Sequence, residues 1–451
     1  MRNWLFIILV FTSGNLLAQD HHEELEHRTH HVDVENLKDF LGKGEAHGFV
    51  RYSFMSTWHP RFNHDYFANA LGGNLGYYTP SYKGFSFGIS GLFVHNIYST
   101  PVEVTEESHE SAERWYGRLS PYELQLFDIN HPEKKDDLDR LEELFLLYQH
   151  KNMAFKIGKM DVESPLINRT DTRMKPYVVR GALFQTDFKK YNSKLTVSWF
   201  DKASPRSTTH WFYMNDAVGI YWQGYTTDGE AYHYAGELQT AGIGMAGYEA
   251  TIKAFDISVW DYYFENISNT VFVEVEREVE LEKPHHELQF GVQYVHQDAV
   301  NRGGNSEKIH SYMDAGESSN VLSGKAGVKT EHWLFSGNYS WITADGRFLF
   351  PQELGRENFY TSMPRARLEG LGKTHSAVLK AEWKPTFAKH MTSTMMAGRN
   401  WLPAWDDYQF NKYQKQSYDH VALDFKYQFI GFLEGLTVDL FYVYQDTQWL
   451  N

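Results

Sequence analysis

The chain of 451 residues contains no cysteine, so no disulfide stabilises it and no lipid-modified cysteine anchors it. It has only 13 prolines, as expected where strands dominate. No apolar stretch reaches the roughly 20 residues that a transmembrane helix needs. The net charge of -15 argues against nucleic acid or an anionic surface as a partner. These absences exclude a disulfide-stapled domain, a helical membrane protein and a nucleic-acid binder.

The first residues predict an export signal. Arg2 lies near the start, an apolar run fills 4–11, and small residues lead to Ala18. A charged start, a short apolar segment and a small-residue exit are the parts of a secretory signal peptide. The apolar run is too short for a transmembrane helix. We therefore predict a signal peptide over residues 1–19.

Aromatic side chains are abundant, and apolar residues alternate with polar ones. Tyr, Phe and Trp number 29, 31 and 13 and make up 16% of the chain, as in the aromatic girdles of membrane barrels. Alternation is clearest over 421–429, where every odd residue is apolar. It recurs over 288–294, 333–341 and 377–383. Such strands present one face to lipid and the other to water.

Connection lengths separate this chain from a soluble sandwich, whose strands also alternate. In membrane barrels, short periplasmic turns alternate with long outer loops along the chain. The tight links that we predict are 80–83, 150–152, 189–193, 330–332, 385–390 and 430–435. The long polar links are 98–140, 161–177, 298–320, 345–374 and 400–417. We therefore expect an all-β, transmembrane antiparallel β-barrel over 45–451.

Strand parity leaves one ambiguity in the middle of the chain. The strands 194–201 and 288–297 must both run outward, so an odd number of strands must lie between them. Only two are recognisable there, near 252–264 and 270–281. Either one of the two is spurious, or a third lies at 218–225 or 242–248.

The last recognisable strand, 436–445, also runs outward, so an inward closing strand is missing. We expect about eighteen strands, an even number, and a chain truncated at its C-terminus.

Motifs around residue 170 resemble a known family. A strand ends with Lys156-Ile157-Gly158-Lys159, and a loop with Ser164-Pro165 follows. The next strand, which begins near Arg180-Gly181, is preceded by Asp171-Thr172-Arg173-Met174-Lys175-Pro176. This order is similar to that in the OprD-like family of substrate-selective outer-membrane porins, although Lys159 stands where the family more often has Arg. The segments 327–329, 355–367 and 426–438 also look like that family. The resemblance extends from about residue 48 to 448, and only the 171–176 element is specific.

The resemblance implies a water-filled barrel narrowed by long extracellular loops that fold into the lumen. It implies passive diffusion of amino acids or small carboxylates, with no cofactor and no enzymatic activity. The expected partners are small solutes, outer-membrane lipids and lipopolysaccharide, and the expected state is a monomer or loose trimer. By matching position, the resemblance puts Asp171, Arg173, Lys175 and Arg180 at or near the constriction, and Arg356, Arg365 and Arg367 on a basic wall.

Charges of one sign along a wall guide a solute without trapping it, and the planar fork of Arg suits a carboxylate. The alternative is that these cations are solvated loop residues or bind lipopolysaccharide phosphates.

A period of two also puts Glu274, Glu276 and Glu278 on one face of a strand. Facing the lumen they would attract cations. We favour the alternative, in which the strand continues above the membrane and water screens them.

The segment 20–44 is polar and rich in histidine. A metal site is one hypothesis for His21, His22, His27, His30 and His31, and it would link the barrel to metal uptake. We favour a disordered tail, because no apolar residues surround these side chains. No GxSxG element is present, so the chain is not expected to be an enzyme. A barrel that binds or displays rather than conducts is the remaining alternative.

Overall fold

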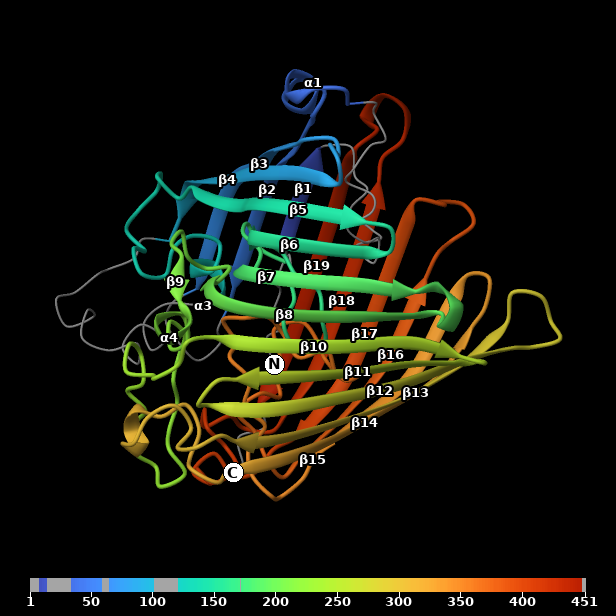
Figure 1. Cartoon of the computed structure of the whole chain (residues 1–451). Coiled ribbons are helices and arrows are strands. Elements are labelled where there is room, and N and C mark those ends of the chain that lie inside the picture. The colour runs from blue at the N-terminus through green and yellow to red at the C-terminus, as the bar shows by residue number, and fades with distance from the viewer. Residues whose placement is uncertain (1–7, 14–33, 59–64, 101–120, 171, 448–451) are drawn as a thin grey trace.

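The computed structural model describes residues 8–13, 34–58, 65–100, 121–170 and 172–447. Strands form one antiparallel sheet that curves around on itself (Figure 1). They are β1 Ile8–Ser13, β2 Glu45–Thr57, β3 Tyr66–Tyr78, β4 Phe85–Ser99, β5 Arg140–His150, β6 Met153–Met160, β7 Val178–Phe188, β8 Ser193–Ser204, β9 Phe212–Tyr213, β10 Ile243–Ile252, β11 Phe255–Phe264, β12 Ser268–Glu280, β13 Glu287–Ala299, β14 Ser318–Lys329, β15 Trp333–Ile342, β16 Thr374–Trp383, β17 Met391–Trp401, β18 Tyr418–Gln428 and β19 Leu436–Thr447. Setting aside the two-residue β9 leaves eighteen strands in the described residues, which is the predicted total. One of the eighteen is β1, which lies where the closing strand was expected to be missing.

Helices are few and short in the described residues: α1 Leu37–Gly42, α3 Pro121–Leu124 and α4 Met214–Ala217, with 3-10 turns at Lys189–Tyr191, Lys308–His310 and Gly431–Leu433. None of the helices described is long and apolar enough to cross a membrane.

The two faces of the sheet differ in the sense that the alternation predicts. On β16, Leu379 points outward and is 69% exposed, whereas the neighbouring Val378 is 3% exposed. On β15, Trp333 and Tyr339 are exposed on the outer face, while Ser340 is buried on the inner one. Large apolar and aromatic side chains exposed along the outer face are the pattern of a transmembrane barrel rather than of a water-soluble sheet.

Connections alternate in length along the sheet, which confirms the predicted loop pattern. Long loops gather at the left of Figure 1 and short turns at the right. The long connections are 100–139, 161–177, 205–242, 300–317, 343–373 and 402–417, with a shorter one at 58–65. One connection on the loop side, 265–267, has only three residues.

The parity ambiguity is resolved by β10. This strand pairs with β8 on one side and β11 on the other, so the third strand predicted between 202 and 250 is the second of the two candidate segments. The other candidate, 218–225, is not a strand. Gly219 and Gly224 there have φ of 104° and 72°, which is turn geometry that a strand does not adopt.

The seam between β2 and β19 holds β1. Its residues pair antiparallel with both neighbours, as a strand between two parallel-running strands must. β1 has 6 residues and β19 has 12, so the seam is only partly filled. β1 lies within the segment that we predict to be the signal peptide, and that assignment stays a prediction.

Much of the apolar core lies inside the barrel and comes from the loops. The largest cluster of buried side chains joins inner-face strand residues such as Phe272 and Val295 to loop residues such as Leu166, Phe348 and Leu371. The long loops therefore fold into the interior, as the family resemblance implies.

Candidate functional site

Two inward-folded loops meet inside the barrel. The side chain of Asn168, in loop 161–177, donates to the carbonyl oxygen of Arg356 at 2.7 Å and accepts from the Arg356 amide at 3.1 Å. The approach is close at Gly355, whose φ is 157°: a Cβ there would lie 2.7 Å from the Asn168 nitrogen. Only glycine fits, and the loops 161–177 and 343–373 are thereby fixed against each other.

Strand side chains on the inner face hold both loops in place. The Tyr262 hydroxyl on β11 donates to Ser164 Oγ at 3.0 Å. Gln297 on β13 accepts from the Leu349 amide at 2.9 Å. Thr361 Oγ1 donates to Ser340 Oγ on β15 at 2.7 Å. The two loops thus cross the interior over the inner faces of β11 to β15.

An arginine cluster forms where these loops meet. We use this name for Arg173, Arg206, Arg356, Arg365 and Arg367. Arg367 donates to the Tyr177 hydroxyl at 3.3 Å and pairs with Glu357 at 3.5 Å. The Arg206 guanidinium lies 5.2 Å from the centre of the Tyr177 ring.

Two further members, Arg173 and Arg365, are tied to the barrel wall. Arg51 on β2 donates to the Arg173 carbonyl at 2.6 Å, and Arg365 donates to Thr57 Oγ1, also on β2, at 3.3 Å. The cluster therefore spans from β2 to the loop–loop contact.

The guanidinium groups of the arginine cluster lie close enough to repel one another. Burial, and then the charges of Arg206 and Arg365, hold the pKa of Arg173 well below its usual value. Burial also lowers the pKa of Arg356 to about 10, against the opposing charge of Glu357. Glu357 pairs with Arg367, and the charge of Glu123 acts on Arg173. The five guanidinium groups outnumber these two carboxylates, so the region favours an anion.

The predicted constriction residues do not all join this cluster. Arg173 does, together with Arg356, Arg365 and Arg367 from the predicted basic wall. Lys175 is fully buried, and its Nζ donates to the carbonyl oxygen of Phe127 at 2.7 Å.

Arg180 lies apart and pairs with Asp201. Asp171 lies outside the described residues, as do the five histidines of the N-terminal segment. Among the described residues no group of His, Asp and Glu could hold a metal ion.

Glutamates of β12 face the interior. Glu276 pairs with Lys325 of β14 and accepts from the hydroxyl of Tyr360, in loop 343–373, at 2.9 Å. Gln293 donates to Glu274. Glu278 accepts from Gln289 at 2.8 Å, nearer the turn at 281–286. Glu274 and Glu276 therefore belong to a neutralised polar network within the barrel.

A buried lysine that the sequence did not single out joins three loops. The Nζ of Lys412 lies 4.2 to 5.7 Å from the centres of four tyrosine rings. These rings belong to Tyr232, Tyr234, Tyr312 and Tyr413. Burial lowers the pKa of Lys412 to about 8, although Glu369 acts in the opposite direction. Such a desolvated cation–π cage fixes the loops 205–242, 300–317 and 402–417 together.

Arg347, which is also buried, links loop 343–373 to the same three loops. It forms a bidentate pair with Glu317, at 2.8 and 3.1 Å. It also donates to the carbonyl oxygen of Tyr225 at 2.8 Å and to the Tyr232 hydroxyl at 3.1 Å. Charge and hydrogen bonding are both satisfied, as a buried guanidinium requires.

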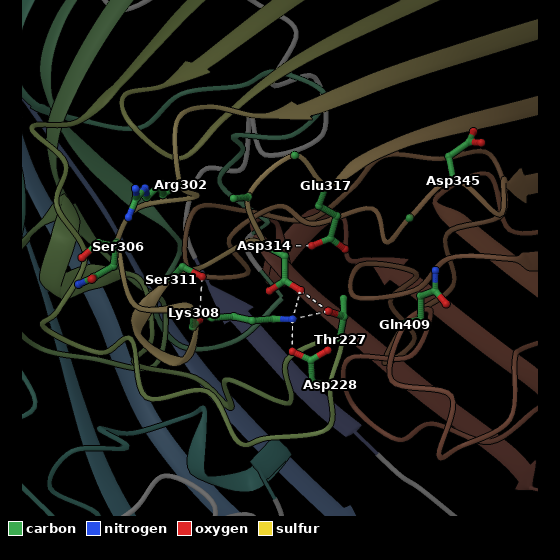
Figure 2. A pocket seen from close by; sticks show the side chains of 14 residues that line it. Thr227, Asp228, Arg302, Ser306, Lys308, Ser311, Asp314, Glu317, Asp345 and Gln409 are labelled. Atoms are coloured by element: carbon green, nitrogen blue, oxygen red, sulfur yellow. Dashed lines mark hydrogen bonds and ion pairs between the residues drawn. The ribbon is translucent and has the colours of Figure 1, made fainter.

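A pocket of about 760 Å³ opens among these loops (Figure 2). Lys308 Nζ points to one side of it, 3.0 Å from Asp314 and 2.7 Å from Thr227 Oγ1, and also pairs with Asp228. Arg302 and Asp345 lie toward opposite ends of the view. Burial would raise the pKa of Asp314, but hydrogen bonds from Thr227 and Lys308 lower it. The pocket is thus a polar vestibule of mixed charge on the loop side.

Solved structures of other bacterial proteins have the same architecture, among them an outer-membrane protein of Pseudomonas aeruginosa. OccAB4 of Acinetobacter baumannii matches with a TM-score of 0.65 and 10% identity, over 99% of this chain and 98% of that one. Pseudomonas aeruginosa OccK9 (OpdG) matches with a TM-score of 0.65 and 10% identity, over 98% of both chains. The P. aeruginosa OpdK structure with vanillate matches at 0.62 and 10%, over 98% of this chain and 99% of that one. The chain has the fold of these proteins.

The resemblance to the OprD-like family is thus confirmed at the level of the fold, over nearly the whole chain. The sequence matches no protein-family model and no curated protein sequence. The shared feature is the architecture, a sheet of about eighteen strands with loops folded inward, at an identity near one residue in ten.

Proposed function

We propose that the protein is an outer-membrane porin for the passive, substrate-selective diffusion of small hydrophilic solutes, with amino acids or small carboxylates as the class. The arginine cluster carries this proposal. It puts five guanidinium groups from three loops inside a barrel whose outer face is apolar. Arg donors pair with carboxylates in a bidentate geometry, and weak repeated contacts let a solute move on.

Three further observations support the proposal. The N-terminal residues have the parts of an export signal. The apolar outer face suits lipid, which places the barrel in an outer membrane. One of the similar structures was solved with vanillate, which carries a carboxylate. Diffusion down a gradient needs no cofactor and no catalytic residue.

Uptake into liposomes that contain the purified protein tests the solute class. The panel is a small carboxylate, a zwitterionic amino acid, and an amine of similar size. We expect the carboxylate to enter severalfold faster than the amine, and the double variant R365A/R367A to lose most of this preference.

The matched control is Arg399→Ala, because Arg399 pairs with Asp419 away from the arginine cluster. Its uptake ratio is expected to equal that of the wild type. Equal entry of carboxylate and amine through the wild-type protein would contradict the proposed selectivity.

A further inference from the structure

Three cations share the outer face of the barrel near the loop side. Lys159 at the end of β6 pairs across the sheet with Leu144 and with Arg180, and Arg180 pairs with Lys202. Cross-strand partners lie on the same face. Leu144 is 37% exposed on the apolar outer face, so the three cations point outward as well.

Two aromatic rings cover these cations. β9 runs across the loop-side ends of the neighbouring strands (Figure 1), and the Trp211 indole donates to the carbonyl oxygen of Leu141 at 2.8 Å. Lys159 Nζ lies 4.6 Å from the Trp211 ring, and Lys202 Nζ lies 3.8 Å from the Tyr213 ring. Aromatic side chains at this height are typical of the boundary between lipid tails and headgroups.

In the described residues, positive charge exceeds negative charge in this patch. Asp201 pairs with Arg180, but the charged groups that act on Lys159 in the described residues are the cations Arg180, Lys202 and Arg140. Three cations and one carboxylate give a net charge of +2 beside an apolar surface. Cations at a membrane surface are stabilised by anionic headgroups, and phosphate is the acceptor that Arg and Lys share.

We propose that Lys159, Arg180 and Lys202 hold a phosphate group of an outer-leaflet glycolipid of the lipopolysaccharide type. Trp211 and Tyr213 would contact the sugar that carries the phosphate. This inference rests on the proposed outer-membrane location, but it concerns the lipid-facing side and not the solute path. The chemistry is a charge-assisted hydrogen bond from each cation to phosphate oxygens, with the aromatic rings excluding water.

The test compares diphosphorylated lipid A with its dephosphorylated form, bound to the full chain in detergent and detected by native mass spectrometry. The variant is K159Q/R180Q/K202Q. The matched control, K189Q/K190Q/K253Q, removes three charges from the opposite, turn side of the barrel. We expect the wild type and the control to retain diphosphorylated lipid A, and the site variant to bind it at least tenfold more weakly.

Binding of the dephosphorylated lipid as tightly as the phosphorylated one would overturn the proposal, as would unchanged binding by the site variant. So would displacement of the lipid by an equal concentration of inorganic phosphate, which would indicate a site for the free ion. If the triple variant does not fold, K159Q/K202Q keeps the Arg180–Asp201 pair and is expected to lose most of the binding.

Solute uptake by the same preparations separates this inference from the proposed function. The site variant is expected to take up carboxylates like the wild type, because its changed residues lie outside the barrel. Lipid retention by a wild-type protein that transports nothing would leave the lipid site standing and overturn the channel.

Discussion

Lys175 is fully buried and ties two loops together. Its Nζ donates to the carbonyl oxygen of Phe127, so loop 161–177 is fixed to the segment that follows α3. Burial lowers the pKa of Lys175 to about 7, with Arg140 acting in the same direction. In water a lysine titrates near ~10.4, so between these two values the locally unfolded loop binds more protons than the folded one.

Local stability around Lys175 should therefore rise with pH. The pKa of Lys175 is lower in the folded loop than in the unfolded one. Burial of the charged ammonium therefore destabilises the folded loop fully below about pH 7, and this destabilisation decreases as the pH rises toward the pKa of the unfolded loop. We expect opening of residues 172–177 to become roughly tenfold rarer between pH 7 and pH 8.5. Hydrogen exchange, corrected for the intrinsic rate, measures it.

The variant Lys175→Met is expected to remove this pH dependence, and Lys135→Met, an exposed neighbour in the adjoining loop, to keep it. An unchanged slope in Lys175→Met would show that another group titrates.

The positions of individual site residues were predictable from the sequence only where those residues belong to a motif. The 171–176 element and the arginines near 356–367 were found through the family resemblance, and four of these arginines come together. Lys412 left no such signal. Its hydrogen-bond partners Tyr234 and Tyr312 are 178 and 100 residues away, and loop tyrosines have no periodicity to reveal a cage.

Among the elements, loop 343–373 crosses the interior of the barrel. Its ends are pinned together, because the Phe348 amide donates to the carbonyl oxygen of Leu371 at 2.9 Å and Gly370 donates back to Phe348 at 2.8 Å. The part between them reaches the inner faces of β12, β13 and β15. It can be shortened without stretching the strands on either side.

Replacement of 351–368 by a short Gly-Ser linker is expected to raise single-channel conductance severalfold and to weaken selectivity, because Arg356, Arg365 and Arg367 leave with the loop. A linker of the same composition in the turn 281–286 serves as the control and is expected to leave conductance unchanged. A conductance that stays at the wild-type value after the loop is shortened would contradict a role for this loop in narrowing the path.

Strands were the best predicted elements, because one buried face and one lipid-suited face impose a period of two. Parity demanded β10, but alternation alone did not choose between its two candidate segments. The choice depends on backbone geometry at Gly219 and Gly224, which loop packing decides. The clusters of buried loop residues were not predictable residue by residue, since their contacts join distant parts of the chain.

At the scale of the whole molecule, the arginine cluster inside the barrel has the opposite sign of charge to the chain as a whole. The net charge is -15, and the vestibule contains Asp228, Asp314, Glu317 and Asp345. Inside, the arginine cluster is positive. Selectivity in a pore is set where the path is narrowest and least hydrated, so the interior arginines should outweigh the acidic exterior.

The reversal potential of the purified protein in a planar bilayer, under a tenfold KCl gradient, tests this account most directly. We predict stepwise currents and a reversal potential of the sign that marks anion preference, shifted toward zero by at least half in Arg173→Ala. Absence of stepwise current would contradict the channel. A cation-selective reversal potential that Arg173→Ala leaves unchanged would contradict the placement of the arginine cluster on the solute path.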